Sequence, residues 1–258
     1  MKSSTLAAAL FSVGAALFAS GAAADEVQVA VAANFSTPMQ RIAADFERET
    51  GHKAQLSIGS TGKFYAQIKN GAPFEVLLAA DEATPKRLEA EGAAVAGTRF
   101  AYAIGQLVLW SARPGFVDGA GDVLRKGDFR HLAIANPKTA PYGAAAVQTL
   151  EALKLFDALA PRFVQGENIA QTQQFVATGN AELGFVALSQ VWRAGGIAEG
   201  SGWIVPAGLH APIRQDAVLL APGRDRPAAI ALLRFLRGEP AQRVIREFGY
   251  ALPQASVQ

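Results

Sequence analysis

The chain has 258 residues, of which 50% are hydrophobic, 18% charged and 9% aromatic, a composition typical of a globular protein rather than a disordered or fibrous one. Its 24 basic and 22 acidic residues nearly cancel, and no basic run or stripe stands out, so nucleic-acid binding is not expected. The sequence contains no cysteine, which excludes disulfides, cysteine chemistry and lipidation of a cysteine.

Residues 1–24 have the order of a secretory signal peptide. Lys2 precedes an apolar run, and the small residues Ala22, Ala23 and Ala24 follow it, as at a cleavage site. The run is shorter than the roughly 20 residues of a membrane-spanning helix, and no later stretch reaches that length. We therefore expect a soluble protein, exported to the periplasm, that is not a lipoprotein.

Strand and helix patterns alternate between residues 27 and 92. The expected strands are 27–32, a segment containing Leu56 and Ile58, and 74–80. The first expected helix has Met39, Ile42 and Phe46 on one face and ends at Gly51; the second opens at the turn 59–63, and the third runs from Thr84 to near Gly92. This alternation predicts a parallel sheet with helices on both faces.

A second such unit follows residue 105. The strand-like run 100–110 is broken by Gly105, and after an irregular segment at 113–128 the pattern resumes with strands at 131–135, 163–164 and 183–188 and helices at 144–155 and up to Gly179. Residues 213–220 indicate a strand that returns to the first unit. Two amphipathic helices, 227–236 and 240–248, close the chain, with Ile230, Leu233 and Leu236 expected on a core face.

These patterns predict an α/β fold of two lobes. Each lobe is expected to be a mainly parallel sheet flanked by helices, with a ligand cleft between the lobes. The predicted first lobe comprises residues 25–104 and 217–258, and the predicted second lobe comprises residues 105–216.

Four strand-to-helix turns, two from each lobe, are candidates for a binding site: Ala33-Asn34, Ser60-Thr61, Pro141-Tyr142 and Asn168-Ile169. Such turns lie at the carboxyl ends of the strands, and each helix start offers unpaired N–H groups and about half a positive charge. Any one turn could be an ordinary helix cap. Together they favour a site that holds an anion without a full counter-charge.

Other readings of the same residues find less support. A nucleotide-binding P-loop ending in Gly62-Lys63 would need glycine at Ser57 and a hydroxyl residue at Phe64, so it is rejected, and Lys63 is left as a surface charge or a rim contributor. The three histidines lack metal-ligand spacing, no G-x-S-x-G motif occurs, and Asp81 is better explained as a helix cap than as an acid or base. We expect no enzyme activity and no cofactor.

Short motifs occur in a fixed order along the mature chain. They are Ala-Ala-Asn-Phe at 32–35, Gly-Ser-Thr-Gly at 59–62, Tyr-Ala-Gln-Ile at 65–68, Asn-Gly-Ala-Pro at 70–73, Ala-Asp-Glu at 80–82, Ala-Ile-Gly-Gln-Leu-Val-Leu-Trp-Ser at 103–111, Asn-Pro at 136–137, Ala-Pro-Tyr-Gly at 140–143 and Leu-Gly-Phe-Val-Ala-Leu at 183–188. Together they resemble the periplasmic molybdate-binding proteins of molybdate ABC transporters, over essentially the whole mature chain.

This resemblance implies the type II periplasmic-binding-protein fold and a tetrahedral molybdate or tungstate dianion in the cleft. Molybdenum would be present only as the centre of that oxyanion, held through its oxygens by hydroxyl, amide and backbone N–H donors. Asn34 matches a side-chain donor, Thr61 a hydroxyl donor, and Tyr142 and Ile169 backbone donors. Ala33 and Ser60 are further candidates.

One position departs from the family pattern. Some members contribute a tyrosine hydroxyl from the strand that corresponds to residues 186–188, where this chain has Ala187. A buried dianion with an unpaired oxygen would cost on the order of 1–3 kcal/mol or more, so another donor is expected to compensate.

The resemblance implies that the protein captures molybdate, and tungstate too, and delivers it to a membrane permease by lobe closure, as a monomer. Alternatives within the same class are sulfate or phosphate binding. A phosphate-ester enzyme and an exported partner of a sensor protein are alternatives from other classes.

Overall fold

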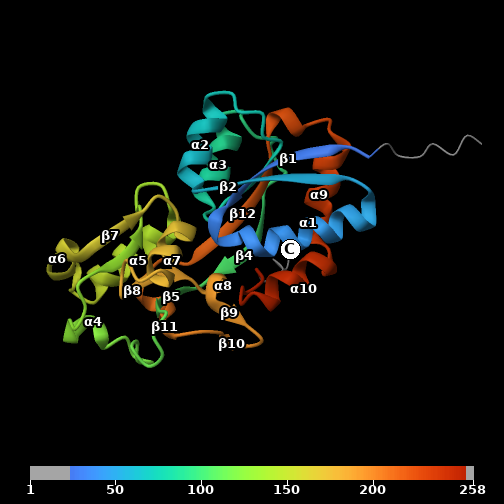
Figure 1. Ribbon diagram of the computed structural model, residues 1–258. Helices are drawn as coiled ribbons and strands as arrows, with labels where there is room; N and C mark the ends of the chain where they lie inside the picture. Colours follow the sequence, from blue (N-terminus) through green and yellow to red (C-terminus); the bar gives the residue numbers. More distant parts are fainter. Residues whose placement is uncertain (1–23, 254–258) are drawn as a thin grey trace, which may run out of the picture.

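The computed structural model describes residues 24–253, which form two lobes, each built on a five-stranded sheet (Figure 1). The predicted signal peptide, residues 1–24, lies outside the described residues except for Ala24. Between residues 24 and 253, no helix combines the length and the apolar character that crossing a membrane requires.

The first sheet has the strand order β2-β1-β3-β12-β4. Its strands are β1 (Glu26–Ala32), β2 (Lys53–Gly59), β3 (Val76–Leu78), β4 (Phe100–Gly105) and β12 (Ile213–Leu219). Strand β1 is parallel to β2 and β3, whereas β12 is antiparallel to both of its neighbours. The sheet is therefore mainly parallel, and one of its strands comes from near the end of the chain.

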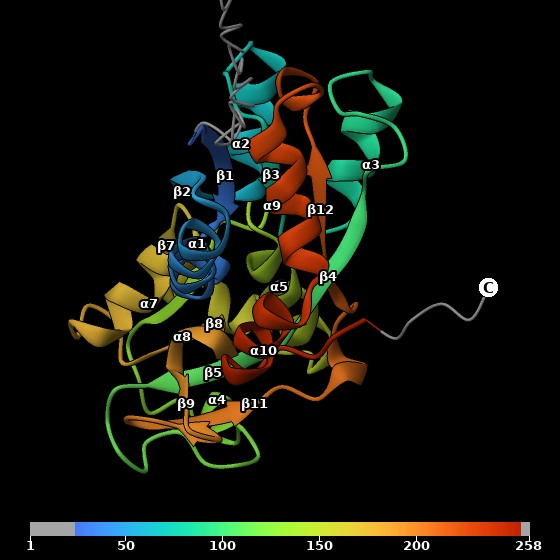
Figure 2. The ribbon, with the colours of Figure 1, turned by 90° about the vertical axis from the view of Figure 1, so that its right-hand side faces the viewer.

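Helices cover both faces of the first sheet. One face packs against α1 (Ser36–Thr50), α9 (Pro227–Arg237) and α10 (Glu239–Glu247), the helices on the near side in Figure 2. The other face packs against α2 (Thr61–Lys69) and α3 (Ala83–Ala90). The predicted core face of α1, with Met39, Ile42 and Phe46, is fully buried, and Gly51 ends this helix in the left-handed region at φ 76°.

The second sheet has the order β11-β5-β8-β6-β7. Its strands are β5 (Leu107–Ser111), β6 (Leu132–Ala135), β7 (Phe163–Gly166), β8 (Leu183–Ala187) and β11 (Ser201–Ile204). Strand β6 is parallel to β7 and β8, and β5 is antiparallel to β8 and β11. The two sheets and their helices confirm the predicted two-lobed α/β fold.

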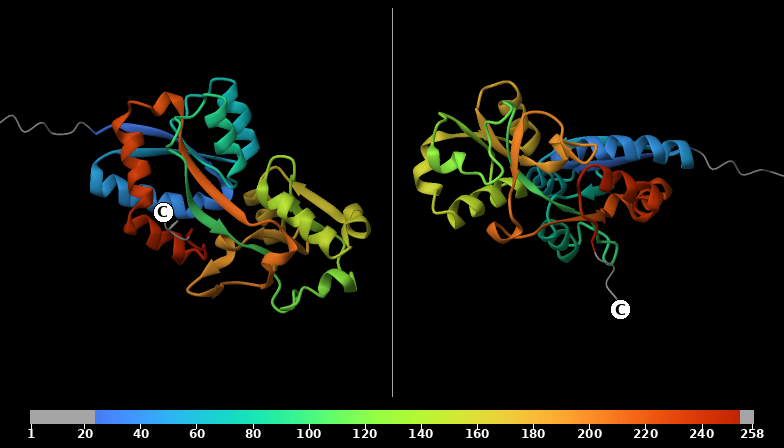
Figure 3. Two further views of the ribbon diagram at one scale, coloured as in Figure 1. Left: turned by 180° about the vertical axis from the view of Figure 1, so that it is seen from behind. Right: turned by 90° about the horizontal axis from the view of Figure 1, so that it is seen from below.

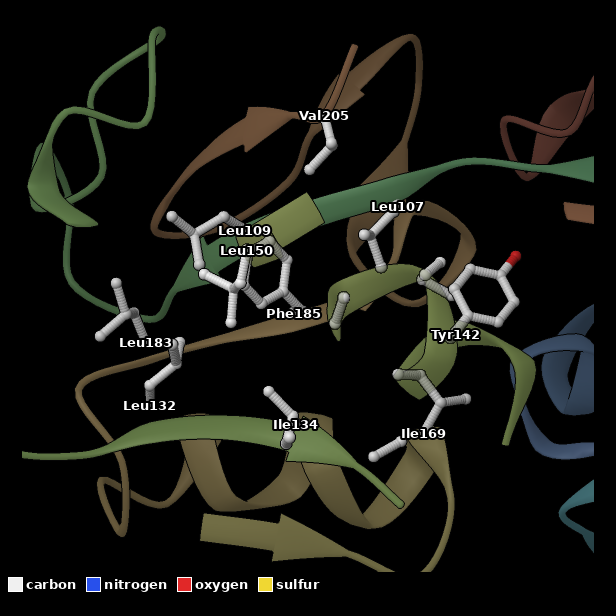
Figure 4. Packing of buried hydrophobic residues seen from close by; sticks show 14 of the residues in the cluster. Leu107, Leu109, Leu132, Ile134, Tyr142, Leu150, Ile169, Leu183, Phe185 and Val205 are labelled. Carbon is white, nitrogen blue, oxygen red and sulfur yellow. The ribbon is translucent and has the colours of Figure 1, made fainter. Parts of the chain in front are cut away.

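Helices α5 (Pro141–Ala152) and α7 (Ile169–Ala177) flank the second sheet. Figure 4 shows the core on the α5 side, where leucine and isoleucine side chains gather and Tyr142 lies at the edge of the cluster. Shorter elements complete the molecule: η1 (Ala33–Phe35), α4 (Val123–Lys126), α6 (Phe156–Leu159), η2 (Ala160–Arg162), α8 (Leu188–Val191), β9 (Trp192–Arg193), β10 (Gly196–Ile197), η3 (Ala207–Leu209) and η4 (Ala221–Gly223).

The chain passes between the lobes along β4 and β12, which lie side by side (Figure 3). Strand β4 ends at Gly105, so the predicted break separates a strand of the first sheet from one of the second. A Cβ atom on Gly105 would lie 2.0 Å from the Tyr142 hydroxyl oxygen, so a side chain cannot fit there. The predicted boundaries at 104/105 and 216/217 stay a prediction, and β12 pairs with the first sheet from Ile213 onward.

The predicted core face of the first closing helix is partly wrong. Leu233 and Leu236 are buried in α9, but 40% of Ile230 is exposed. The face that packs on the sheet instead includes Ala228, Ala229 and Leu232.

Candidate functional site

A small cavity of about 10 Å³ lies between the lobes. Three chain segments of the first lobe and two of the second line it, at the carboxyl ends of β1, β2, β3, β6 and β7. The structure brings all six residues of the predicted site to this cavity: Ala33, Asn34, Ser60, Thr61, Tyr142 and Ile169.

Four backbone N–H groups at the cavity come from the starts of helical segments. Asn34 lies in η1 just before α1, Thr61 is the first residue of α2, Tyr142 the second of α5 and Ile169 the first of α7. Within residues 24–253 none of these four N–H groups donates a hydrogen bond. Free N–H groups at helix starts carry partial positive charge, so they favour an anion.

Two hydroxyl groups of the first lobe add to these donors. The Thr61 Oγ1 atom accepts the N–H of Ala80 at 2.9 Å, which leaves its own proton to donate elsewhere. Ser60 is the N-cap residue of α2, yet its side chain makes no capping bond, and its buried Oγ atom has no hydrogen-bond partner in the described part of the chain. A buried hydroxyl without a partner is uncommon and points to a ligand or water at the cavity.

The side chain of Asn34 is used differently from the prediction. Its Nδ2 atom donates to Gln215 Oε1 at 2.8 Å and to the Tyr250 hydroxyl at 2.9 Å, which occupies both of its side-chain N–H groups. The donor that Asn34 can offer to the cavity is therefore its backbone N–H.

Behind the cavity, a buried polar network joins the two lobes. Gln215 Oε1 also accepts from the Tyr102 hydroxyl at 3.0 Å, and Gln215 Nε2 donates to the Tyr142 hydroxyl at 3.2 Å across the lobes. The Tyr250 hydroxyl and Ser189 Oγ both donate to the Asn34 carbonyl, at 2.8 and 2.9 Å. No sequence pattern indicates this network, because its members lie up to 216 residues apart and share no motif.

Burial dominates the electrostatics of this network. It raises the pKa of Tyr250 to about 12, and it raises the pKa values of Tyr102 and Tyr142 well above the ordinary tyrosine value. All three phenols are therefore neutral at physiological pH and can act as donors and acceptors in the network.

Among residues 24–253, no charged side chain lines the cavity. Asp81 is nearby but accepts the N–H of Thr84 at 2.7 Å through Oδ1, as expected of a residue that caps α3, and burial raises its pKa. No group of His, Cys, Asp and Glu residues that could hold a metal ion is found between residues 24 and 253. What the cavity presents is a set of neutral donors.

Two further predicted positions lie outside this lining. Ala187 ends β8 and donates its N–H to Gln190 Oε1 at 2.9 Å. Lys63 forms a salt bridge with Glu167, which belongs to the other lobe and precedes the turn at Asn168.

A larger open cleft of about 330 Å³ adjoins the cavity and shares Ala80, Ala140 and Pro141 with it.

Known proteins are similar to this chain over most of its length. Residues 27–251 match the model of the family described as bacterial extracellular solute-binding protein. The molybdate-binding protein ModA of Azotobacter vinelandii is 60% identical over 96% of this chain and 98% of its own, and ModA of Rhodobacter capsulatus is 52% identical over 89% of each. A solved structure of the periplasmic molybdate-binding protein of A. vinelandii superposes with a TM-score of 0.86 at 43% identity, covering 88% of this chain and all of that one.

Proposed function

Because the chain belongs to the family of bacterial extracellular solute-binding proteins, we infer that it binds molybdate in the periplasm and delivers it to the permease of an ABC transporter. One observation carries this inference: a chain 60% identical to a molybdate-binding protein has an interlobe cavity that, within the described part of the chain, is lined by neutral donors and by no charged side chain. Such a cavity suits a fully deprotonated oxyanion, which has acceptors only.

In the proposed complex, both lobes contribute donors to the oxyanion. The first lobe offers the N–H of Asn34 and the hydroxyls of Ser60 and Thr61, and the second offers the N–H groups of Tyr142 and Ile169. The unpartnered Ser60 hydroxyl supplies the donor that Ala187 lacks. Ala33 lines the cavity and packs beside the anion without a side-chain donor.

The donor set also governs which anions are accepted. A phosphate that carries a proton needs an acceptor, whereas molybdate, tungstate and sulfate need only donors. We propose that the cavity binds tungstate in addition to molybdate, and that it rejects sulfate because of the size of this anion. Lobe closure follows from the same geometry, because donors on both lobes reach one small anion only when the lobes are together. The exported protein acts as a monomer.

Thermal unfolding of ligand-free protein with molybdate, tungstate, sulfate or phosphate tests this proposal. A ligand present at about 100 times its Kd adds about 2.7 kcal/mol to the free energy of unfolding. We expect stabilisation by molybdate and tungstate at micromolar or lower concentrations, and none by phosphate. Stabilisation by sulfate alone would reassign the anion, and the absence of any effect of molybdate would refute the proposal.

A further inference from the structure

The two lobes touch directly at the mouth of the cavity, through residues that do not line it. The N–H of Gly62, in the first turn of α2, donates to the carbonyl of Thr139 in the second lobe at 2.9 Å. Gly62 and Thr139 both line the outer cleft rather than the anion cavity. This backbone hydrogen bond therefore joins the lobes without using any of the donors that face the cavity.

The contact at Gly62 depends on the absence of a side chain. A Cβ atom on Gly62 would lie 2.9 Å from Thr139 Cα, closer than real Cβ atoms approach, and 3.1 Å from Thr139 O, which is also unusually tight. The φ angle of Gly62 lies outside the left-handed region, so the backbone itself would accept alanine. What excludes a side chain is the opposite lobe.

The loop that carries the Thr139 carbonyl is held in place from its own lobe. The N–H of Asn136 donates to the carbonyl of Gly166 at 2.8 Å, and the carbonyl of Asn136 accepts the N–H groups of Thr139 and Ala140 at 3.2 and 2.8 Å. The Asn136 side chain accepts the N–H of Lys138 at 3.0 Å. A loop fixed by these bonds cannot easily yield to a methyl group on Gly62, so the lobes would have to separate instead.

An ion pair lies next to this contact. Lys63 follows Gly62, and its Nζ atom pairs with the carboxylate of Glu167, directly before the Asn168-Ile169 turn of the second lobe. The side chains are 52% and 58% exposed, so solvent screens the pair and its contribution is small. Neither residue lines the anion cavity.

We propose that the Gly62–Thr139 hydrogen bond and the Lys63–Glu167 pair form a latch that holds the lobes closed over the anion and sets how fast it is released. This proposal rests on the proposed function, since it assumes that the cavity holds molybdate. A contact made only between closed lobes stabilises the closed state, and ligand release requires that state to open. The latch residues thus act on affinity through closure rather than by touching the anion.

The variant Gly62→Ala tests the latch, with molybdate binding and dissociation measured by calorimetry and stopped-flow fluorescence. Overpacking at the lobe contact raises the Kd for molybdate about five- to a hundred-fold, mainly through faster dissociation. The melting temperature of the anion-free protein stays the same or rises, because alanine is a better helix former than glycine. Gly119→Ala, at a glycine whose Cβ would meet nothing within 4 Å, is the control and changes neither property.

The ion pair is tested by Lys63→Met, Glu167→Gln and the double variant. Each single change raises the Kd by up to about five-fold at low salt, and the two effects are not additive. At 1 M salt the Kd values of the ion-pair variants equal that of the wild type, because salt screens the pair, whereas the Kd of Gly62→Ala remains raised. Arg87→Met, which breaks an exposed pair with Glu91 inside the first lobe, leaves the Kd unchanged.

These results separate the latch from the function it rests on. Wild-type protein that fails to bind molybdate overturns the proposed function and the latch with it. If the wild-type protein binds molybdate and Gly62→Ala releases it at the same rate as the wild type, the result overturns the latch alone. A Gly62→Ala variant that loses affinity only in step with its anion-free stability marks a structural role and also overturns the latch. If Gly62→Ala does not fold, additive effects in the Lys63 and Glu167 cycle overturn the contribution of the pair, and non-additive effects support it.

Discussion

At the scale of single residues, the two hydroxyls of the Ser60-Thr61 turn differ in what they do for the protein itself. Thr61 Oγ1 accepts the buried N–H of Ala80, so this side chain serves the anion-free fold as well as the proposed site. Ser60 Oγ is buried and has no hydrogen-bond partner among residues 24–253, so replacing Ser60 with alanine removes no hydrogen bond of the anion-free protein. The two residues are therefore distinguishable by experiment.

Ser60→Ala is expected to weaken molybdate binding without destabilising the anion-free protein. A hydrogen bond to a charged group contributes about 1.5–3 kcal/mol, so the Kd rises about ten- to a hundred-fold, while the free energy of unfolding changes by less than about 0.5 kcal/mol. Calorimetry and urea unfolding measure the two effects. Thr61→Val, by contrast, weakens molybdate binding and also lowers the free energy of unfolding by about 1–3 kcal/mol, because it leaves the Ala80 N–H unpaired. The exposed Ser57→Ala is the control, and an unchanged Kd for Ser60→Ala would remove Ser60 from the site.

At the scale of secondary-structure elements, the turn that begins α7 has two roles, capping the helix and offering an N–H group to the cavity. The Asn168 side chain caps α7 by accepting the N–H groups of Ala170 and Gln171 at 3.0 and 3.1 Å, which leaves the N–H of Ile169 for the cavity. This turn can therefore cap the helix and bind an anion at the same time, because the two functions use different atoms.

Replacement of Asn168 by aspartate should separate these two roles. Aspartate caps a helix about as well as asparagine, so the melting temperature is retained, but it places a negative charge at the edge of the cavity. We expect the Kd for molybdate to rise at least about ten-fold through charge repulsion. Asn168→Ala does the reverse: it costs about 1 kcal/mol of stability and affects the Kd less. Equal binding by the aspartate variant, measured by calorimetry, would show that no anion sits at this helix start.

At the scale of the whole molecule, buried tyrosines couple the lobes and the chain ends to the cavity. Tyr250, near the end of the chain, donates to the carbonyl of Asn34 near its beginning, and Gln215 reaches Tyr142 in the other lobe. Burial keeps the three phenols of this network protonated. The network thereby makes the position of η1 depend on both lobes.

The raised tyrosine pKa values predict a loss of stability at alkaline pH. The folded protein holds the Tyr250 proton up to a pKa of about 12, against 10.0 for an ordinary tyrosine, so the folded state binds more protons than the unfolded state in this interval. The corresponding stabilisation is fully present below pH 10 and is lost as the pH rises toward 12. Urea unfolding between pH 8 and 12 should show a shallower decline for Tyr250→Phe than for wild type. Tyr65→Phe, at a partly exposed site, should decline as wild type does; identical slopes for all three proteins would contradict the prediction.

The sequence by itself determined the local elements and the turns that could bind an anion. Apolar periodicity placed α1, and Gly105 marked the change of lobe, because these signals depend on neighbours along the chain. The motifs also led to the family. They placed the residues of the candidate site at strand ends, which the fold then brought together at one cavity.

Only the tertiary structure decided which atoms of those residues are free. Gln215 and Tyr250 use both side-chain N–H groups of Asn34, so its backbone faces the cavity, and packing of α9 on the sheet leaves Ile230 exposed. The partner of Lys63 and the tight approach at Gly62 likewise come from the opposite lobe. Sequence patterns report the periodicity and conformational preferences of a segment, whereas hydrogen-bond partners and close contacts depend on residues that are distant in the chain and adjacent only after folding.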